Sequence, residues 1–174
     1  MGNNFFEYLQ QLELIAFFSG YPLIYFITFS IVGNKSLQND FKNNIVSLLP
    51  FAYALVGTLY LGLQLKNLYP NYTIENMKLG IQLPWLMGWA LLSILFWIPA
   101  LGKKKIISLI HSLIFFLILI KDFFMQISRS FGEWDIVRND MKLYTYSLLI
   151  NLAAIAFMVL VSFFFTYFKK RAGR

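Results

Sequence analysis

Five long apolar segments limit the fold of this chain more than any other feature of its sequence. They cover residues 14–33, 45–65, 81–101, 106–120 and 143–168. A helix that crosses a membrane needs about 20 mainly apolar residues, because the hydrocarbon layer is about 30 Å thick. Segment 106–120 is shorter and would rise only about 22 Å at 1.5 Å per residue. Lys105 and Lys121 flank this segment and can extend their side chains to the headgroups, so we expect a span there too, over 104–127.

The composition indicates that lipid is the solvent for most of these segments. Charged residues make up 13% of the chain and hydrophobic residues 59%, whereas a soluble domain has about 25% charged residues. The excess of apolar residues lies in blocks, which a larger soluble core does not explain. We therefore predict an all-α, polytopic helical membrane protein, in which residues 1–174 form a single bundle of five transmembrane helices.

The first segment gives an alternative to this count. Gly20, Tyr21 and Pro22 lie in its middle, and a proline removes a backbone donor and can break a helix. The alternative is four spans plus an N-terminal helix that lies in the interface or re-enters the membrane. Residues 1–13 contain no Lys or Arg, so the distribution of basic residues does not choose between the two.

The distribution of basic residues predicts an orientation. The net charge is +7, and two dense basic clusters, Lys103–Lys105 and residues 169–174, adjoin predicted spans. Two spans separate the clusters, so both lie on one side, which the positive-inside rule makes the cytoplasm. We expect an outside N-terminus, a cytoplasmic C-terminus and anionic lipids at the cytoplasmic face. No basic and aromatic module for reading bases is present, so we expect no nucleic-acid partner.

Five polar residues in or beside the spans are candidates for a pathway through the membrane. Ionisable residues inside a membrane are functional candidates by default, and Asn151 lies deep in the last segment. Asp122 and Arg129 follow His111 by 11 and 18 positions, which places the three on nearly one face of a helix. The candidates are Glu13, His111, Asp122, Arg129 and Asn151.

The face that carries His111 has two interpretations. Phe115 and Ile118 lie on it between the polar residues, so it is polar at its ends and apolar at its centre. An apolar constriction of this kind is typical of a hydrophobic gate. The simpler interpretation is an anchored helix whose His111 forms a hydrogen bond with a neighbouring helix.

Two further stripes of residues indicate helix packing. Small and hydroxyl-bearing residues on one face let helices approach closely and form hydrogen bonds with each other. The stripe on segment 143–168 also includes Asn151 and Met158. The candidate packing residues are Tyr53, Gly57, Tyr60 and Gln64 on segment 45–65, and Ser147, Ala154 and Ser162 on segment 143–168.

The sequence shows no constellation for catalysis. It has no cysteine and one histidine, too few for a zinc site or for a haem with two histidine ligands. It has no glycine-rich phosphate loop and no Gly-x-Ser-x-Gly motif. Residues 121–142 mix charged and aromatic residues and suit a docking surface or a linker. We predict no cofactor, no metal site and no enzymatic activity.

Two function classes are consistent with these features. The first is a non-enzymatic accessory or interaction subunit of a membrane assembly, formed with copies of itself or with a membrane protein partner. The second is an oligomeric pore, channel or transport component with His111, Asp122 and Asn151 facing its axis, such as a permeability effector in bacterial stress or defence. The abundance of Phe, Ile, Asn, Lys and Tyr is consistent with an AT-rich genome and favours a bacterial cytoplasmic membrane.

Overall fold

The computed structural model describes residues 11–33, 40–69, 83–129 and 134–172, and no strand occurs in these ranges. The predicted all-α class is confirmed. After a helical stretch at 11–18 come α2 (Tyr21–Gly33), α3 (Asp40–Leu68), α5 (Pro84–Leu91), the 3-10 helix η1 (Leu92–Trp97), α6 (Pro99–Gly102), α7 (Lys105–Arg129) and α8 (Trp134–Ala172).

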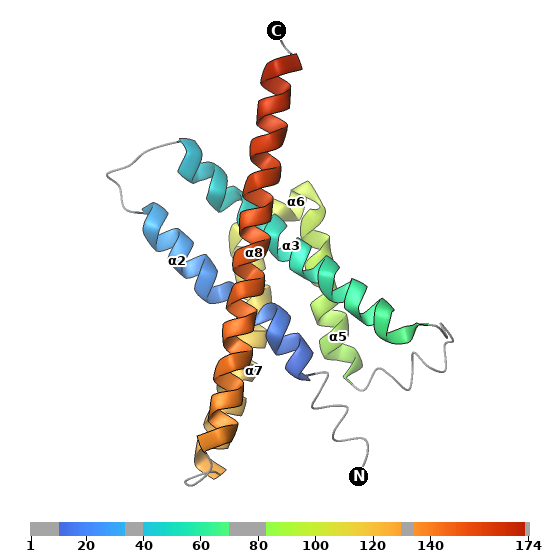
Figure 1. Ribbon diagram of the computed structural model, residues 1–174, viewed down its shortest axis with the longest axis vertical. Helices are drawn as coiled ribbons and strands as arrows, with labels where there is room; N and C mark the ends of the chain where they lie inside the picture. Colours follow the sequence, from blue (N-terminus) through green and yellow to red (C-terminus); the bar gives the residue numbers. More distant parts are fainter. Residues whose placement is uncertain (1–10, 34–39, 70–82, 130–133, 173–174) are drawn as a thin grey trace.

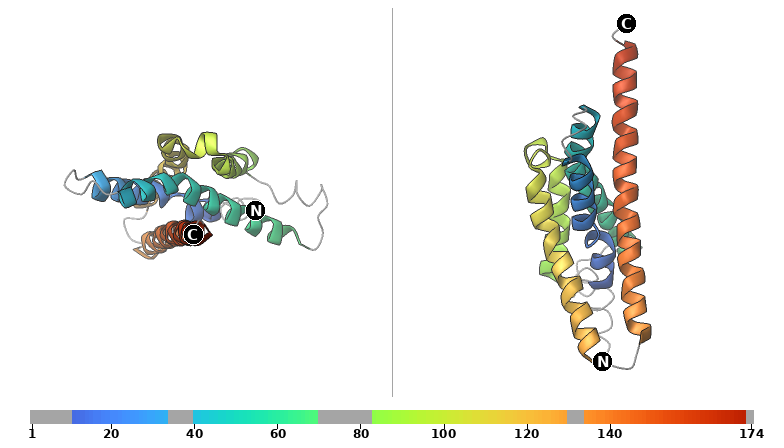
Figure 2. Two further views of the ribbon diagram at one scale, coloured as in Figure 1. Left: turned by 90° about the horizontal axis from the view of Figure 1, so that it is seen from above. Right: turned by 90° about the vertical axis from the view of Figure 1, so that its left-hand side faces the viewer.

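The helices form three layers. Residues 11–33 and α3 run antiparallel beside each other and make the middle layer (Figure 1). Figure 2 shows α8 on one side of this layer, and α5, η1, α6 and α7 on the other. Since α3 packs mainly against η1 and α8, it is the central element of the bundle.

Among the described residues, four helices are long and apolar enough to cross a membrane: Gln11–Ser30, Ile45–Asn67, Lys105–Met125 and Lys142–Lys169. This agrees with a membrane helical protein, but the expected count of five spans is not confirmed. The N-terminal segment, which the alternative placed in the interface, is among the four. The segment that falls short is the third, whose longest apolar piece is Pro84–Trp97.

The third segment consists of three helical pieces, and Pro99 accounts for the break between the last two. Pro99 is the first residue of α6, and Ile98 before it is extended, with φ −70° and ψ 123°. A residue that precedes a proline is sterically disfavoured in the helical region, so the helix ends there. Side-chain packing against α3 also brings η1 close, since a Cβ atom added at Gly57 would lie 1.9 Å from Ser93 Oγ. The expected single helix over 81–101 is therefore replaced by α5, η1 and α6.

The last helix is longer than the sequence analysis predicted. Most of the expected linker 121–142 is helical, because α7 continues to Arg129, two residues beyond the predicted span 104–127, and α8 begins at Trp134. The loss of apolar character was taken as the boundary of the last helix at residue 143, but polar residues also form helices. Within 121–142, Gly132 is the only glycine and there is no proline, so only the residues around Gly132 strongly disfavour a helix.

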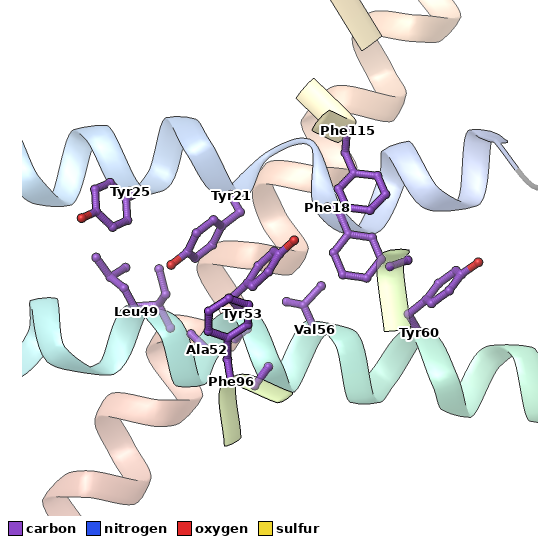
Figure 3. Packing of buried hydrophobic residues seen from close by; sticks show 14 of the residues in the cluster. Phe18, Tyr21, Tyr25, Leu49, Ala52, Tyr53, Val56, Tyr60, Phe96 and Phe115 are labelled. Carbon is purple, nitrogen blue, oxygen red and sulfur yellow. The ribbon is translucent and has the colours of Figure 1, made fainter. Parts of the chain in front are cut away.

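Aromatic rings from several helices fill the centre of the bundle (Figure 3). Tyr21 packs on Tyr53 of α3 with ring centroids 4.4 Å apart, and Phe18 stacks on Phe115 of α7 at 4.8 Å. These residues are almost fully buried. They hold the break in the first span between α3 and α7, where the buried polar residues described next are found.

Candidate functional site: a buried polar network at a helix break

The helix of the first span is interrupted at Ser19 and Gly20, which form a turn between residues 11–18 and α2. Pro22 follows as the second residue of α2 and has no backbone N–H. In an uninterrupted helix the N–H of Gly20 would donate to the carbonyl of Ala16. Here it donates instead to Ser147 Oγ of α8 at 2.8 Å.

Asn151, one turn further along α8, supports the other side of the same break. Its Nδ2 donates to the carbonyl oxygen of Phe17 at 2.9 Å and to that of Ser147 at 2.8 Å. In a regular helix the carbonyl of Phe17 would accept from Tyr21. Ser147 and Asn151, which we call the α8 clamp, therefore provide one acceptor and one donor to backbone groups at the break.

Gly20 allows α8 to come this close. A Cβ atom at position 20 would lie 2.7 Å from the backbone carbon of Ser147 and 2.8 Å from the backbone nitrogen of Leu148. These are backbone atoms, so no side chain could rotate away to make room. Any residue larger than glycine would displace α8 from the first span and weaken the clamp.

His111 of α7 lies in an aromatic enclosure on the other side of the break. The Tyr53 hydroxyl and His111 Nδ1 are hydrogen-bonded at 2.8 Å. Trp89 of α5 stacks on the imidazole, with centroids 4.7 Å apart and planes 8° apart, and its Nε1 donates to the His111 carbonyl at 3.2 Å. The rings of Phe96 and Phe115 complete the enclosure, and His111 is only 8% exposed.

A different pair of helices, α2 and α7, is joined by a hydrogen bond about one turn of α7 away from His111. The Tyr21 hydroxyl lies 2.8 Å from Ser108 Oγ. The Ser108 hydroxyl in turn lies 2.8 Å from the carbonyl of Lys105, to which it donates, so Tyr21 is the donor to Ser108. Since the Tyr21 ring packs on Tyr53, the break, Ser108 and His111 form one continuous buried region.

Two atoms of this region have no hydrogen-bond partner in the described part of the chain. They are His111 Nε2 and Asn151 Oδ1. A buried polar atom left without a partner typically costs about 1–3 kcal/mol. The network is therefore incomplete at one atom on α7 and one on α8.

The two candidate carboxylates lie apart from His111 and are bonded to glutamines. Glu13 Oε2 accepts from Gln64 Nε2 of α3 at 2.9 Å. Asp122 Oδ2 accepts from Gln11 Nε2. Gln11 and Glu13 belong to the same helical stretch, so these contacts tie the start of the first span to α3 and α7.

The other predicted residues have the following places. Arg129 is the last residue of α7, and its side chain is outside the described part. Tyr53, Gly57, Tyr60 and Gln64 are buried on α3, whereas on α8 Ser147, Ala154 and Met158 are buried and Ser162 is half-buried. The structure thus brings Asn151 to the break and Tyr53 to His111, but it does not bring Asp122 to either.

Sequence reasoning missed several members of the network: Ser19, Gly20, Tyr21, Trp89 and Ser108 as bonding partners, and Gln11 as the donor to Asp122. One feature of the sequence could have indicated the α8 clamp. A break at Gly20 and Pro22 leaves unbonded backbone groups, and a pair of polar residues four apart on another span can bond them. Nothing in the sequence indicated which tryptophan would stack on His111.

The chemistry of this region is that of hydrogen bonding between helices. The phenol of Tyr53 and the imidazole of His111 are enclosed by aromatic rings, and among the described residues no carboxylate is bonded to either group. Among the described residues, no group of three or more His, Asp or Glu side chains could hold a metal ion. No protein-family model, curated protein or solved structure matches this chain.

Proposed function

We propose that this protein is a non-enzymatic integral membrane protein that acts as an accessory or interaction subunit of a membrane assembly. One observation carries the proposal. Polar side chains within the spans point inward and are largely bonded inside the chain, while the outward surfaces of the last two spans are apolar. Such a molecule can contact other membrane components only through apolar helix faces or through its ends.

The extent of the apolar surface supports this proposal. Within the candidate spans, 50% of the Ile45–Asn67 window is buried, compared with 22% for Lys105–Met125 and 17% for Lys142–Lys169. Soluble monomers rarely expose contiguous apolar patches larger than a few hundred Å². Large side chains that are more than half exposed on these two helices include Ile110, Leu117, Leu149, Leu152, Phe157 and Leu160.

In this proposal the third segment also crosses the membrane, as a short pass. At about 1.5 Å per residue for α5 and about 2.0 Å per residue for η1, the two together rise about 24 Å. A bilayer can thin locally around a pass that is shorter than its hydrocarbon layer. Close packing of η1 on α3 at Gly57 supports its place inside the bundle.

We further propose a bacterial cytoplasmic membrane, with the C-terminus in the cytoplasm. Lys103 and Lys104, between α6 and α7, and Lys105 at the start of α7 lie at the same end of the bundle as the C-terminal end of α8 (Figure 1). Lys169 and Arg171 are exposed at that C-terminal end. This gathering of basic residues supports the positive-inside orientation.

A pore or transport path is the second candidate function. Two observations favour it: the unpaired atoms His111 Nε2 and Asn151 Oδ1, and the broken first span beside them. Discontinuous helices line the binding sites of many transporters. Because His111 and Asn151 lie between helices of one chain, such a path would run within the bundle, not along the axis of a symmetric oligomer.

Cross-linking in the native membrane tests the accessory function. The chain has no cysteine, so a single introduced cysteine is the only reactive thiol. With a maleimide that carries a benzophenone photocrosslinker, which forms bonds to C–H groups of a neighbouring chain, Leu152→Cys on the exposed face of α8 should give a defined adduct larger than the chain. The matched control is Ala154→Cys on the buried face of the same turn, which should give none. Monomer alone at Leu152, Leu160 and Leu117 would count against an interaction subunit.

Ion flux tests the second candidate. Liposomes that contain the pure protein should show no flux above that of empty liposomes if the accessory function is correct. A flux that His111→Ala or Asn151→Ala alters, while Leu152→Ala leaves it unchanged, would establish the pore or transport path instead.

A further inference from the structure

The C-terminal end of α8 extends beyond the other helices of the bundle (Figures 1 and 2). α8 has 39 residues, which corresponds to about 58 Å of helix and nearly twice the thickness of a hydrocarbon layer. Its apolar part alone, Lys142–Lys169, has 28 residues and a length of about 42 Å. The last turns of α8 therefore have an apolar surface that no other described helix covers.

Aromatic rings surround this end of the helix. Five of its side chains are between 54% and 74% exposed: Phe163, Phe164, Phe165, Tyr167 and Phe168. Successive residues turn by about 100°, so these rings point in directions all around the axis. A partner helix would cover only one face, whereas lipid surrounds a helix that is apolar on all sides.

The polar groups of this end also fit a lipid surface better than a protein partner. The Thr166 hydroxyl donates to the carbonyl of Ser162 in the same helix at 2.9 Å, so it is used within α8. Lys169 and Arg171 follow the rings and are exposed. Residues 141–174 contain no Asp or Glu, so every charged side chain there is basic and complements an anionic surface.

We propose that residues 163–171, which we call the aromatic–basic end, bind an anionic phospholipid leaflet. The rings lie at the boundary between acyl chains and headgroups, and Lys169 and Arg171 contact the lipid phosphates. This inference deepens the proposed function and rests on it, because it requires a protein inserted in the membrane. It assigns α8 the role of an anchor that selects anionic lipid on one side.

The test uses full-length Tyr167→Cys protein labelled with an environment-sensitive fluorophore and reconstituted in mixed phosphatidylcholine and phosphatidylglycerol vesicles. Quenching by spin-labelled phosphatidylglycerol, compared with spin-labelled phosphatidylcholine, gives the preference of the labelled site for the anionic lipid. We expect a preference of roughly fivefold for each basic residue in contact. The double variant K169Q/R171Q should lower it by roughly fivefold for each of the two residues, whereas K103Q/K104Q, with the same loss of charge at the same end, should leave it unchanged.

Three results would overturn the inference. The first is equal quenching by the two lipids in the parent protein, and the second is loss of the preference in K103Q/K104Q as well. The third is shielding of the label that rises with protein density and not with anionic lipid, which would indicate a second copy as the occupant. Extraction of the protein by alkaline carbonate distinguishes the two proposals. A chain that stays in the vesicles but shows no preference refutes only the anchor, and a chain that is extracted refutes the membrane protein itself.

Discussion

Asn151 Nδ2 lies 2.9 Å from the carbonyl oxygen of Phe17, to which it donates a hydrogen bond, and the two residues are 134 positions apart. The bond joins the last span to the first at the point where the helix of the first span is broken. This contact explains how a break in the helix can be tolerated at that point. Backbone groups freed in a membrane need partners from neighbouring helices, and α8 supplies them.

Replacement of Asn151 by leucine should destabilise the protein. The Phe17 carbonyl would lose its side-chain donor in a partly buried place, with an expected loss of about 1 kcal/mol, in the range of hydrogen bonds between membrane helices. The measurement is the midpoint of unfolding in mild detergent. Leu152→Ala, on the exposed face beside it, is the control and should change the midpoint little. An Asn151→Leu protein as stable as the parent would contradict the clamp.

Gly20→Ala should destabilise the protein more than replacement of a glycine on an open surface does. The new Cβ atom would lie 2.7 Å from a backbone carbon of Ser147, and such overpacking costs about 1–3 kcal/mol. Gly62→Ala is the matched control, because a Cβ atom there has nothing within 4 Å. We expect Gly62→Ala to be neutral or slightly stabilising, since alanine favours helix more than glycine does. Equal effects at the two positions would show that α8 does not contact Gly20.

The Tyr53 and His111 pair should behave as one structural unit. Tyr53→Phe leaves His111 Nδ1 without its partner, and His111→Phe leaves the Tyr53 hydroxyl without one, so each should cost about 1 kcal/mol. The double variant removes both polar groups and should cost less than the sum of the singles. A double-mutant cycle in detergent measures the difference. Strictly additive losses would mean that the two side chains do not interact.

Glu13→Gln should leave stability nearly unchanged. A glutamine at position 13 keeps an acceptor for Gln64 Nε2, which now donates to Glu13 at 2.9 Å. Gln64→Leu is the informative comparison, because it leaves the carboxylate without its donor and should destabilise by about 1–3 kcal/mol. The unfolding midpoints of the two variants test whether Gln64→Leu destabilises the protein more than Glu13→Gln does. A liposome flux abolished by Glu13→Gln would instead indicate that the carboxylate carries charge across the membrane.

The sequence was sufficient for the helical class, because long blocks of apolar residues indicate it. Segment lengths and flanking lysines located α7 within a few residues. The third segment was harder, since its hydropathy matched a straight span while Pro99 and the packing of Ser93 on Gly57 determined its bends. Local hydropathy contains no information about such packing.

The candidate site was only partly predictable for a similar reason. His111 and Asn151 were recognisable because a polar residue in an apolar run is exceptional. Their partners were not, because a tyrosine or a tryptophan near a span end also fits an interfacial position. Trp89 is an example, because its place in the sequence also fits an interfacial position but its ring stacks on His111 inside the bundle. The pairing of Asp122 with Gln11 depends on how two distant helices pack, and no spacing within α7 could indicate it.

The bend at Ile98 and Pro99 bears on how this chain enters a bilayer during its synthesis. In the five-pass arrangement, α5 and η1 together are shorter than the hydrocarbon layer. They pack on α3 at Gly57, and α3 has already been synthesised when they emerge. Membrane insertion would then require the translocation machinery to retain α3 until α5 and η1 have been synthesised. The order of synthesis, and not the hydropathy of each segment, would decide the final topology.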